Sequence, residues 1–584
     1  MHPHSYRDAS YPIVFYFFNL FFVISNFTLP TSSVANSNSM TMKKILTLIF
    51  LTISVASYGQ TGNWLWGRGA TGTGVGQEGT GMTTDANGNT TIVGGYADAM
   101  MTFGNDTIMN SHISTMDGYV GKLSSSGNVL WLKSIGGMNS EIPNAVCTDA
   151  IGNVYVTGSS SSGTIVFDAI SLLNGSSNGM FVVKYDINGN AIWAKGASGV
   201  NSTSGYGVSA DSYGNIYVAG GYNDSVTFGA TTLVSAGGQD AFLNKYDSNG
   251  NLVWAKSEGG TSGDVGASVR VDNGSNIIMV GYFTGSSITF GSFTLTNAGQ
   301  EDIYVVKYDS SGTVLWAKSG NGNGDEYVQQ VSTDFNGDVF VGGSFNSSSL
   351  LFGSSVLHSI GGLDAFIVKY NSSGNVIWAK SGGGNTNDYG FSVSADSSGN
   401  SYISGGFTDP SILFDSYTIT APAFTTQPMF IVKFDSSGSI LCADALSCAG
   451  DDYVGVSVDN FGNAYISGDY SASPFFIIGP DTLTSYGLAF IAKYNCPASA
   501  GINELQQQEN ISIYPDPFTN QITFLLSNND PTTLFLYDLL SRKILQQTFI
   551  NSTTINTMPL AKGLYLYEVL GKDGSCGKGK VVKE

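Results

Sequence analysis

Acidic side chains recur at related places in glycine-rich segments of this chain, and they are the residues best suited to bind a ligand. The candidates are Glu78, Glu141, Asp264, Asp325 with Glu326, Asp388, and Asp451 with Asp452. Carboxylates ligate cations and accept hydrogen bonds from hydroxyl-rich ligands such as glycans. The alternative is that acids in such loops cap strand ends and keep a surface soluble. No residue is predicted to be catalytic.

A second set of aspartates opens turns of the form Asp-x-x-Gly-Asn. These are Asp85, Asp149, Asp211, Asp272, Asp334, Asp396 and Asp459. We expect each carboxylate to accept hydrogen bonds from backbone N–H groups two or three residues further on, with Gly at a positive φ. Calcium coordination is the alternative, but the full ligand series of a calcium loop is missing from the sequence. A structural role is therefore predicted for these aspartates. No metal site and no cofactor are predicted, and calcium is the one alternative left open.

Composition excludes several classes of function. The four histidines, His2, His4, His112 and His358, are too few and too scattered for a multi-histidine catalytic or metal site. The formal net charge of −20 disfavours nucleic acid and anionic membrane surfaces as partners, because both would repel the chain. With 75 glycines among 584 residues and only 12% charged residues, the chain suits an all-β protein with many tight turns.

The chain repeats itself at a period of about 62 residues. A tryptophan-bearing segment recurs, with a cysteine in its last copy, at Trp66, Trp131, Trp193, Trp254, Trp316, Trp378 and Cys442. A lysine in an apolar segment recurs in phase with it at Lys122, Lys184, Lys245, Lys307, Lys369, Lys433 and Lys493. Together with the turn aspartates, these markers define seven copies of one unit.

Each copy contains four short apolar segments separated by turns, as in residues 205–211, 215–221, 241–247 and 251–257 of the third copy. Seven four-stranded antiparallel units predict a β-propeller over residues 60–496. The region begins with one strand, 62–68, and ends with the third strand of the last copy, 489–495. The first strand therefore supplies the missing fourth, so that the ring closes.

In such a propeller the loops that carry the acids lie on one face, where they would surround the mouth of the central channel with negative charge. Inserts between the second and third strands, as at 225–229 and 287–291, predict an extra hairpin on the same face. Ligand binding is expected there, because variable loops on a rigid scaffold usually carry function. The repeated tryptophans are predicted to pack between units and not to serve as sugar platforms.

The copies resemble the SBBP-type β-propeller repeat family. Its motifs S-x-D-x-x-G-N-x-Y-V-x-G and D-A-F-V-x-K-Y-D correspond to residues 209–220, 240–247 and 364–371. The resemblance covers residues 60–496 and implies an extracellular propeller, but it implies no reaction.

The N-terminal region predicts export. Residues 42–59 have the basic start, apolar run and small residues of a signal peptide, with cleavage between Gly59 and Gln60. Residues 1–41 are interpreted as a mis-assigned or disordered extension, although 11–29 is apolar enough to span a membrane. No spanning segment is predicted after Gln60. In an oxidising compartment Cys442, Cys448 and Cys496 could form a disulfide of undetermined pairing, whereas buried thiols are the alternative.

The C-terminal part follows a different pattern. After a linker, 497–510, alternating apolar segments in 511–584 predict a small Ig-like β-sandwich. Its Tyr514-Pro515-Asp516-Pro517 and its segment from Asp538 to Arg542 resemble the type A C-terminal sorting domain of the type IX secretion system of Bacteroidetes-type bacteria. The resemblance implies secretion or attachment at the cell surface, with the type IX machinery as partner.

These observations lead to one main hypothesis and two alternatives. The main hypothesis is a non-catalytic binding or adhesion protein whose loop face engages a glycan or a protein. One alternative is an extracellular polysaccharide hydrolase or lyase that uses two loop carboxylates. The other is a structural component of a surface layer.

Overall fold

The computed structural model describes residues 62–72, 77–112, 115–174, 178–199, 201–422, 427–447, 454–470, 476–483, 488–496, 511–515, 517–526, 531–538, 542–570 and 577–583. All regular structure in these ranges is β-strand, which confirms the all-β class. No helix in the described ranges is long and apolar enough to cross a membrane. The predicted extension 1–41, signal peptide 42–59 and linker 497–510 lie outside the described residues.

Strands between Asn63 and Asn495 form four-stranded antiparallel ladders, which we call units and number along the chain. Unit 1 contains β2 (Gln77–Thr84), β3 (Thr90–Tyr96), β6 (Asp117–Leu123) and β7 (Val129–Gly136). Unit 2 contains β8 (Glu141–Thr148), β9 (Val154–Ser160), β12 (Gly179–Tyr185) and β13 (Ala191–Gly199). Unit 3 contains β14 (Thr203–Ala210), β15 (Ile216–Phe228), β16 (Thr231–Tyr246) and β17 (Leu252–Glu258).

The remaining units follow the same order. Unit 4 contains β18 (Asp264–Val271), β19 (Ile277–Phe283), β22 (Asp302–Tyr308) and β23 (Val314–Gly320). Unit 5 contains β24 (Glu326–Thr333), β25 (Val339–Phe345), β28 (Asp364–Tyr370) and β29 (Val376–Gly383). Unit 6 contains β30 (Asp388–Ala395), β31 (Ser401–Phe407), β34 (Met429–Phe434) and β35 (Ile440–Leu446). Unit 7 contains β36 (Gly455–Val458), β37 (Ala464–Tyr470), β40 (Leu488–Asn495) and β1 (Asn63–Gly72).

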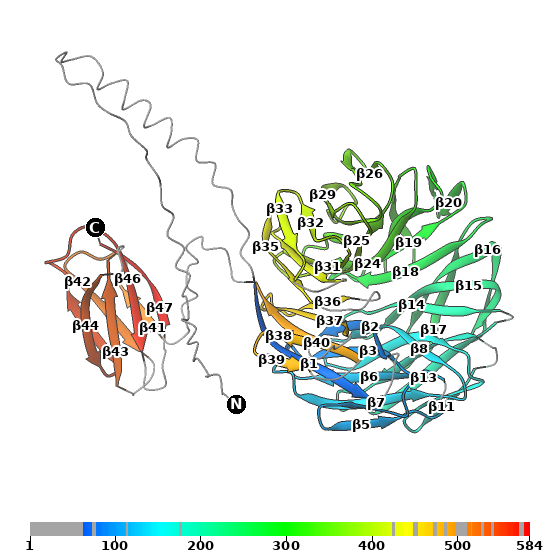
Figure 1. Cartoon of the computed structure of the whole chain (residues 1–584), viewed down its shortest axis with the longest axis horizontal. Helices are drawn as coiled ribbons and strands as arrows, with labels where there is room; N and C mark the ends of the chain where they lie inside the picture. The colour runs from blue at the N-terminus through cyan, green and yellow to red at the C-terminus, as the bar shows by residue number, and fades with distance from the viewer. Residues whose placement is uncertain are drawn as a thin grey trace, which may run out of the picture. The chain divides into compact units, whose positions relative to one another are not determined.

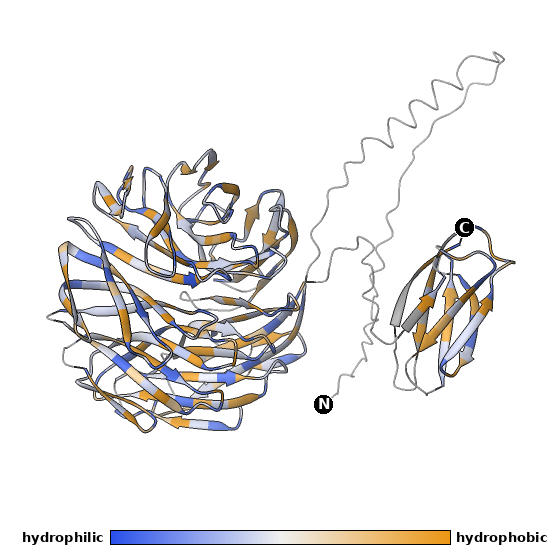
Figure 2. Cartoon of the chain, turned by 180° about the vertical axis from the view of Figure 1, so that it is seen from behind, coloured by the Kyte–Doolittle hydropathy of each residue, from blue (hydrophilic) through white to orange (hydrophobic). Residues whose placement is uncertain are grey.

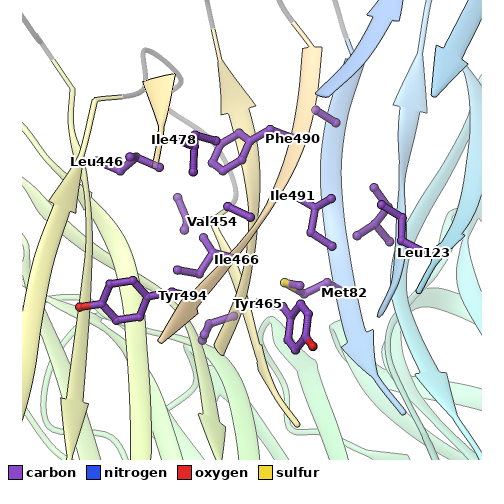
Figure 3. Close-up of a cluster of buried hydrophobic side chains, with 14 of the residues drawn as sticks. Met82, Leu123, Leu446, Val454, Tyr465, Ile466, Ile478, Phe490, Ile491 and Tyr494 are labelled. Carbon is purple, nitrogen blue, oxygen red and sulfur yellow. The ribbon is translucent and has the colours of Figure 1, made fainter. Parts of the chain in front are cut away.

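The first described strand completes the last unit. β1 pairs antiparallel with β40, with Trp66 opposite Lys493 and Trp64 opposite Tyr494, and the two strands lie side by side in Figure 1. Residues from both ends of the repeated region share one hydrophobic core, in which Met82 and Leu123 pack with Ile466 and Ile491 (Figure 3). The predicted pairing of the first strand with the last is therefore present.

The first strands of successive units lie side by side, and β36 lies beside β2. Their sixth residues are buried between neighbouring units, as Val208, Val331 and Val393 show. Several second and third strands are buried along their whole length, as β25 and β28 are. Such strands are covered on both faces, so they are almost continuously apolar. Figure 2 shows hydrophobic segments recurring along the strands of this region.

Hairpins between the second and third strands widen the units. They are β4 (Met100–Phe103) with β5 (Asp106–Met109), β10 (Thr164–Phe167) with β11 (Ile170–Leu173), β20 (Ser287–Phe290) with β21 (Phe293–Thr296), β26 (Leu350–Phe352) with β27 (Ser355–Leu357), β32 (Ser411–Phe414) with β33 (Tyr417–Thr420), and β38 (Phe476–Ile478) with β39 (Asp481–Leu483). In unit 3 the hairpin continues β15 and β16. Several of these hairpins pair with the last strand of the preceding unit, as β10 does with β7 and β32 with β29. The inserts thus connect neighbouring units.

The turn aspartates act through hydrogen bonds. Asp211 Oδ1 accepts the N–H groups of Tyr213 and Asn215, both at 2.9 Å, and the other six turns repeat this pattern. The donors are thus two and four residues on, not two or three. In the fourth copy the residue at positive φ is Ser275 and not Gly274. Several of the repeated lysines form ion pairs with the turn aspartates. Lys307 Nζ, for example, lies 2.8 Å from Asp272 Oδ2, and both side chains are buried.

The repeated tryptophans join one unit to the next. Trp131 Nε1 donates a hydrogen bond to the carbonyl of Ile187, and Trp193, Trp316 and Trp378 make the equivalent bond to the following unit. These four rings are less than 10% exposed. They pack between units, as predicted, and are closed to ligands.

A disulfide joins Cys442 to Cys496, which resolves the pairing that the sequence left open. Cys442 stands in β35, at the position that the other copies give to tryptophan. Cys147 is a buried free thiol. Cys448 and Cys576 lie outside the described residues.

Residues 511–583 contain two sheets. One consists of β41 (Ile511–Tyr514), β42 (Gln521–Leu526) and β45 (Ser552–Asn556), and the other of β44 (Lys543–Phe549), β43 (Thr532–Tyr537), β46 (Gly563–Leu570) and β47 (Gly577–Lys583). Phe524 of the first sheet and Leu536 and Tyr567 of the second share one core. Arg542 returns to Asp538 through a 2.7 Å ion pair, which closes the turn between β43 and β44.

Candidate functional site

The structure buries most of the predicted ligand-binding acids. Glu141, Asp264, Glu326 and Asp388 are the first residues of β8, β18, β24 and β30, and each is at most 1% exposed. Asp325 is half-buried. The side chain of Glu78 and all of Asp451 and Asp452 lie outside the described parts. The expected ring of solvent-facing carboxylates is therefore wrong for Glu141, Asp264 and Asp388.

Each buried acid faces a second acid from the preceding unit, at a constant separation in sequence. The pairs, which we call junction pairs, are Asp117 with Glu141, Asp240 with Asp264, Asp302 with Glu326, and Asp364 with Asp388. Backbone hydrogen bonds fix the contact: the N–H of Asp388 donates to the carbonyl of Leu363, and the N–H of Glu141 donates to that of Met116. The motif repeats because one acid of each pair begins a first strand and the other lies six residues before the end of a third strand.

The junction pairs retain protons. Burial, and then the neighbouring carboxyl groups, raise the pKa of Asp388 to about 7 and that of Asp264 to about 6. Burial raises the pKa of Glu326 to about 8, with Asp302 adding to the shift. One oxygen of each of these three acids is buried and accepts no hydrogen bond. Two buried charges without a cation would repel, so each pair gives up its last proton at a higher pH than ordinary carboxyl groups do.

The same acids order the loops at this end of the units. Asp388 Oδ2 accepts the N–H of Gly384 at 2.6 Å, and Asp364 Oδ2 accepts that of Ile360 at 2.7 Å. Glu141 accepts the hydroxyl of Ser160 at 2.9 Å. The junction pairs are therefore structural, and they position the residues that follow them in the first strands.

A cavity of about 710 Å³ runs between the first strands and is lined by residues of each of them. Valine is the commonest residue of its wall, together with serine, threonine and amide side chains. At the end where the first strands begin, Tyr206, Tyr282, Tyr327 and Phe391 line it. Among the described residues of the wall, Arg270 carries the only charge.

Aromatic side chains form an arc at this mouth, which we call the aromatic arc. It consists of Tyr206 on β14, Tyr282 on β19, Tyr327 on β24 and Phe391 on β30, which line the cavity, and of Tyr389 on β30, which stacks on Phe391. The rings of Tyr389 and Phe391 are stacked, with centroids 5.6 Å apart and an interplanar angle of 8°. Tyr206 is 36% exposed, and the others are half-buried.

Two acids lie beside the aromatic arc. Glu301 and Asp325 form a parallel β-bridge. Burial and the Asp325 carboxylate raise the pKa of Glu301 to about 7. Burial, Glu301, and the neighbours Tyr206 and Tyr327 raise the pKa of Tyr282 to about 12. The mouth thus combines exposed ring faces with carboxyl and phenol groups, which can bind the apolar faces and the hydroxyls of one ligand.

Sequence reasoning found part of this mouth. It selected Asp325 and Glu326, of which only Asp325 lies at the mouth beside the arc. It missed the aromatic arc, although the signal was present: Tyr327 and Tyr389 replace the valine that unit 4 has at the same place, Val265. The prediction about aromatic residues concerned the repeated tryptophans and did not consider the first strands.

Comparison with known proteins identifies the C-terminal part. Residues 512–584 match the secretion system C-terminal sorting domain. The match indicates export by type IX secretion to the cell surface or the extracellular space.

Relatives of the repeated region are more distant. An uncharacterized WD repeat-containing protein, L264, of Acanthamoeba polyphaga mimivirus is 28% identical over 205 residues, covering 30% of this chain and 15% of the relative. The regulatory protein FlaEY of Caulobacter vibrioides is 25% identical over 271 residues, covering 43% of this chain and 28% of the relative. The chain thus spans less than a third of the length of either relative.

Two of the solved structures that match this chain have low sequence identity to it and low TM-scores. Sqt1 from Chaetomium thermophilum is 11% identical, with a TM-score of 0.35, over 79% of this chain and 96% of that one. A europium-containing methanol dehydrogenase is 12% identical, with a TM-score of 0.29, over 68% of this chain and 80% of that one.

Proposed function

We propose that this chain is a secreted or cell-surface binding protein, built on SBBP-type repeats, whose aromatic arc binds a glycan. The units are then the blades of a seven-bladed β-propeller over residues 60–496, closed by β1, and residues 511–584 engage the type IX machinery. The pairing of β1 with β40 and the contact of β36 with β2 support a closed ring.

The observation that carries the proposal is the aromatic arc itself. Buried packing aromatics in this chain repeat from unit to unit, whereas the members of the arc among the described residues belong to units 3 to 6. Partly exposed rings at the mouth of a cavity leave apolar surface in contact with water, and a ligand that covers this surface is stabilised. Sugar rings offer both an apolar face and hydroxyls, and Glu301 and Asp325 can accept hydrogen bonds from the latter.

A glycan array followed by calorimetric titration of the best ligand tests the proposal. Tyr327→Ala and Tyr389→Ala should each weaken binding about tenfold or more, because buried aromatic contacts at binding sites commonly contribute 1–2 kcal/mol or more. Tyr213→Ala is the matched control, since Tyr213 is 79% exposed in the turn between β14 and β15. If Tyr327→Ala, Tyr389→Ala and the unmodified protein bound the ligand with equal affinity, the arc would not be part of the binding site.

A polysaccharide hydrolase is the second candidate, favoured by the raised pKa of Glu301 beside Asp325. An acid that is partly protonated near pH 7 next to a second carboxylate is the pairing that glycoside hydrolysis needs. Incubation of the array ligands with the protein, followed by product analysis, separates the two functions. Turnover that Glu301→Gln and Asp325→Asn abolish would establish the enzyme.

A further inference from the structure

Arg270 departs from the repeat at the seventh residue of the first strands. The other copies have a small residue there: Thr83, Cys147, Ser209, Ser332, Ser394 and Ser457. Two of these hydroxyls join neighbouring units, since Ser209 accepts the N–H of Val271 and Ser332 accepts that of Ala395, both at 3.1 Å. An arginine cannot accept such a bond. Unit 4 therefore has a cation where the other units have a small side chain.

The charge of Arg270 is not neutralised by the protein. Within the described part of the chain its guanidinium makes no ion pair or side-chain hydrogen bond, and it is exposed to the solvent of the cavity. The strands that surround it lower its pKa by desolvation, but an arginine stays charged in proteins. Its ionisable neighbour Cys147 is a neutral thiol near pH 7, because burial raises the pKa of Cys147 to about 12.

Two further hydrogen-bond donors line the same cavity. Ser394 and Ser457 line the wall at the same level of the first strands as Arg270. Both side chains are half-buried, and neither makes a hydrogen bond to a described residue. A planar guanidinium with five N–H donors and two hydroxyls in one cavity is an arrangement that suits the oxygens of an anion.

We propose that Arg270 anchors an anionic group of the ligand, so that the protein selects acidic saccharides bearing a carboxylate or a sulfate. This inference rests on the proposed glycan-binding function. The aromatic arc and Arg270 line the same cavity, and they stand three to five residues apart along the first strands. At 3.3 Å per residue this is about 10–16 Å, so one oligosaccharide of several sugar units can contact both.

Calorimetric titration with an oligouronide and with its methyl ester tests the inference. The unmodified protein should bind the acid about tenfold more tightly than the ester at low salt, since a hydrogen bond to a charged group is worth about that factor. Arg270→Ser introduces the residue that four of the other copies have, so it should fold, and it should bind acid and ester equally. Arg68→Ser, which removes a half-exposed arginine on β1, is the matched control and should retain the preference.

The outcomes separate this inference from the proposed function. Equal affinity of the unmodified protein for acid and ester, or a preference that survives in Arg270→Ser, overturns the role of Arg270 and leaves glycan binding intact. If neither oligosaccharide binds, glucuronate and inorganic sulfate are used as small probes in thermal-shift measurements. An increase in melting temperature that Arg270→Ser abolishes supports an anion site at Arg270 that does not involve the arc. If neither probe changes the melting temperature, the anion site is refuted.

Discussion

The junction pair Asp364–Asp388 makes a prediction about the pH dependence of stability. Burial, then Asp409 and Asp364, raise the pKa of Asp388 from 3.8 to about 7. In the unfolded chain the group ionises near its ordinary value. The folded protein therefore holds a proton that the unfolded chain has lost between about pH 4 and pH 7, so the free energy of unfolding decreases as pH rises through this window.

The magnitude follows from the shift. Three pKa units correspond to about 4 kcal/mol of destabilisation above pH 7, at 1.36 kcal/mol per unit. Asp388→Asn removes this ionisation and retains an oxygen to accept the N–H of Gly384. Because Asp364 and Asp409 remain, we expect the variant to gain only about 1–3 kcal/mol at pH 8, and little or nothing at pH 4.

Urea denaturation at pH 4, pH 5 and pH 8, in the presence of EDTA, measures the effect. Asp247→Asn is the control: hydrogen bonds from Asn251 and Asn249 lower the pKa of Asp247, so this group is charged in both states above pH 5. Its loss should cost a similar amount from pH 5 to pH 8. If Asp388→Asn were less stable than the unmodified protein at pH 8, the protonated pair would be refuted. Stabilisation by added Ca²⁺ at pH 8 that Asp388→Asn abolishes would instead show a cation between the two carboxylates.

Two other predictions concern the closure of the repeats and the turns. In the double variant Cys442→Ala/Cys496→Ala the free energy of unfolding should be about 2–4 kcal/mol lower, because the disulfide closes a loop of 54 residues. An unchanged urea midpoint would show that strand pairing alone closes the last unit. Lys307→Met should cost about 3–5 kcal/mol, because it leaves Asp272 buried without its cation. Lys318→Met, at a half-buried lysine of the same unit, should change stability by about 0.5 kcal/mol or less. A similar loss in both variants would contradict the role of the buried pair.

Much of the fold could be predicted because each unit is encoded locally. The alternating apolar segments, the Asp-x-x-Gly turns and the insert hairpins depend on residues within a few positions of one another. The pairing of β1 with β40 is not local, but it followed from counting strands: the last copy lacks a fourth strand and the chain begins with one. A missing strand in one copy and an extra strand elsewhere can be counted in the sequence, even when the two strands that pair lie at opposite ends of the repeated region.

The site was harder to predict, because its residues meet across units. Asp388 was identified as an acid in a glycine-rich loop, and a loop acid is usually solvated. Its burial depends on Asp364, which the sequence analysis assigned to the apolar motif of the preceding unit. The partner of Cys442 was undetermined for a similar reason, since the repeat itself gives that position to tryptophan and offers no equivalent pair.

Repetition also separates structural residues from functional ones. A contact that every unit needs must be supplied by every unit, so the turn aspartates, the packing tryptophans and the buried valines recur. A ligand without the symmetry of the ring contacts some units and not others, and the residues that bind it must therefore break the repeat. Tyr206, Tyr327 and Phe391 break it at one end of the cavity, and Arg270 breaks it at the other. All four residues line the same cavity. Binding of one asymmetric ligand therefore explains these four differences from the repeat more simply than an unrelated change of packing in each unit.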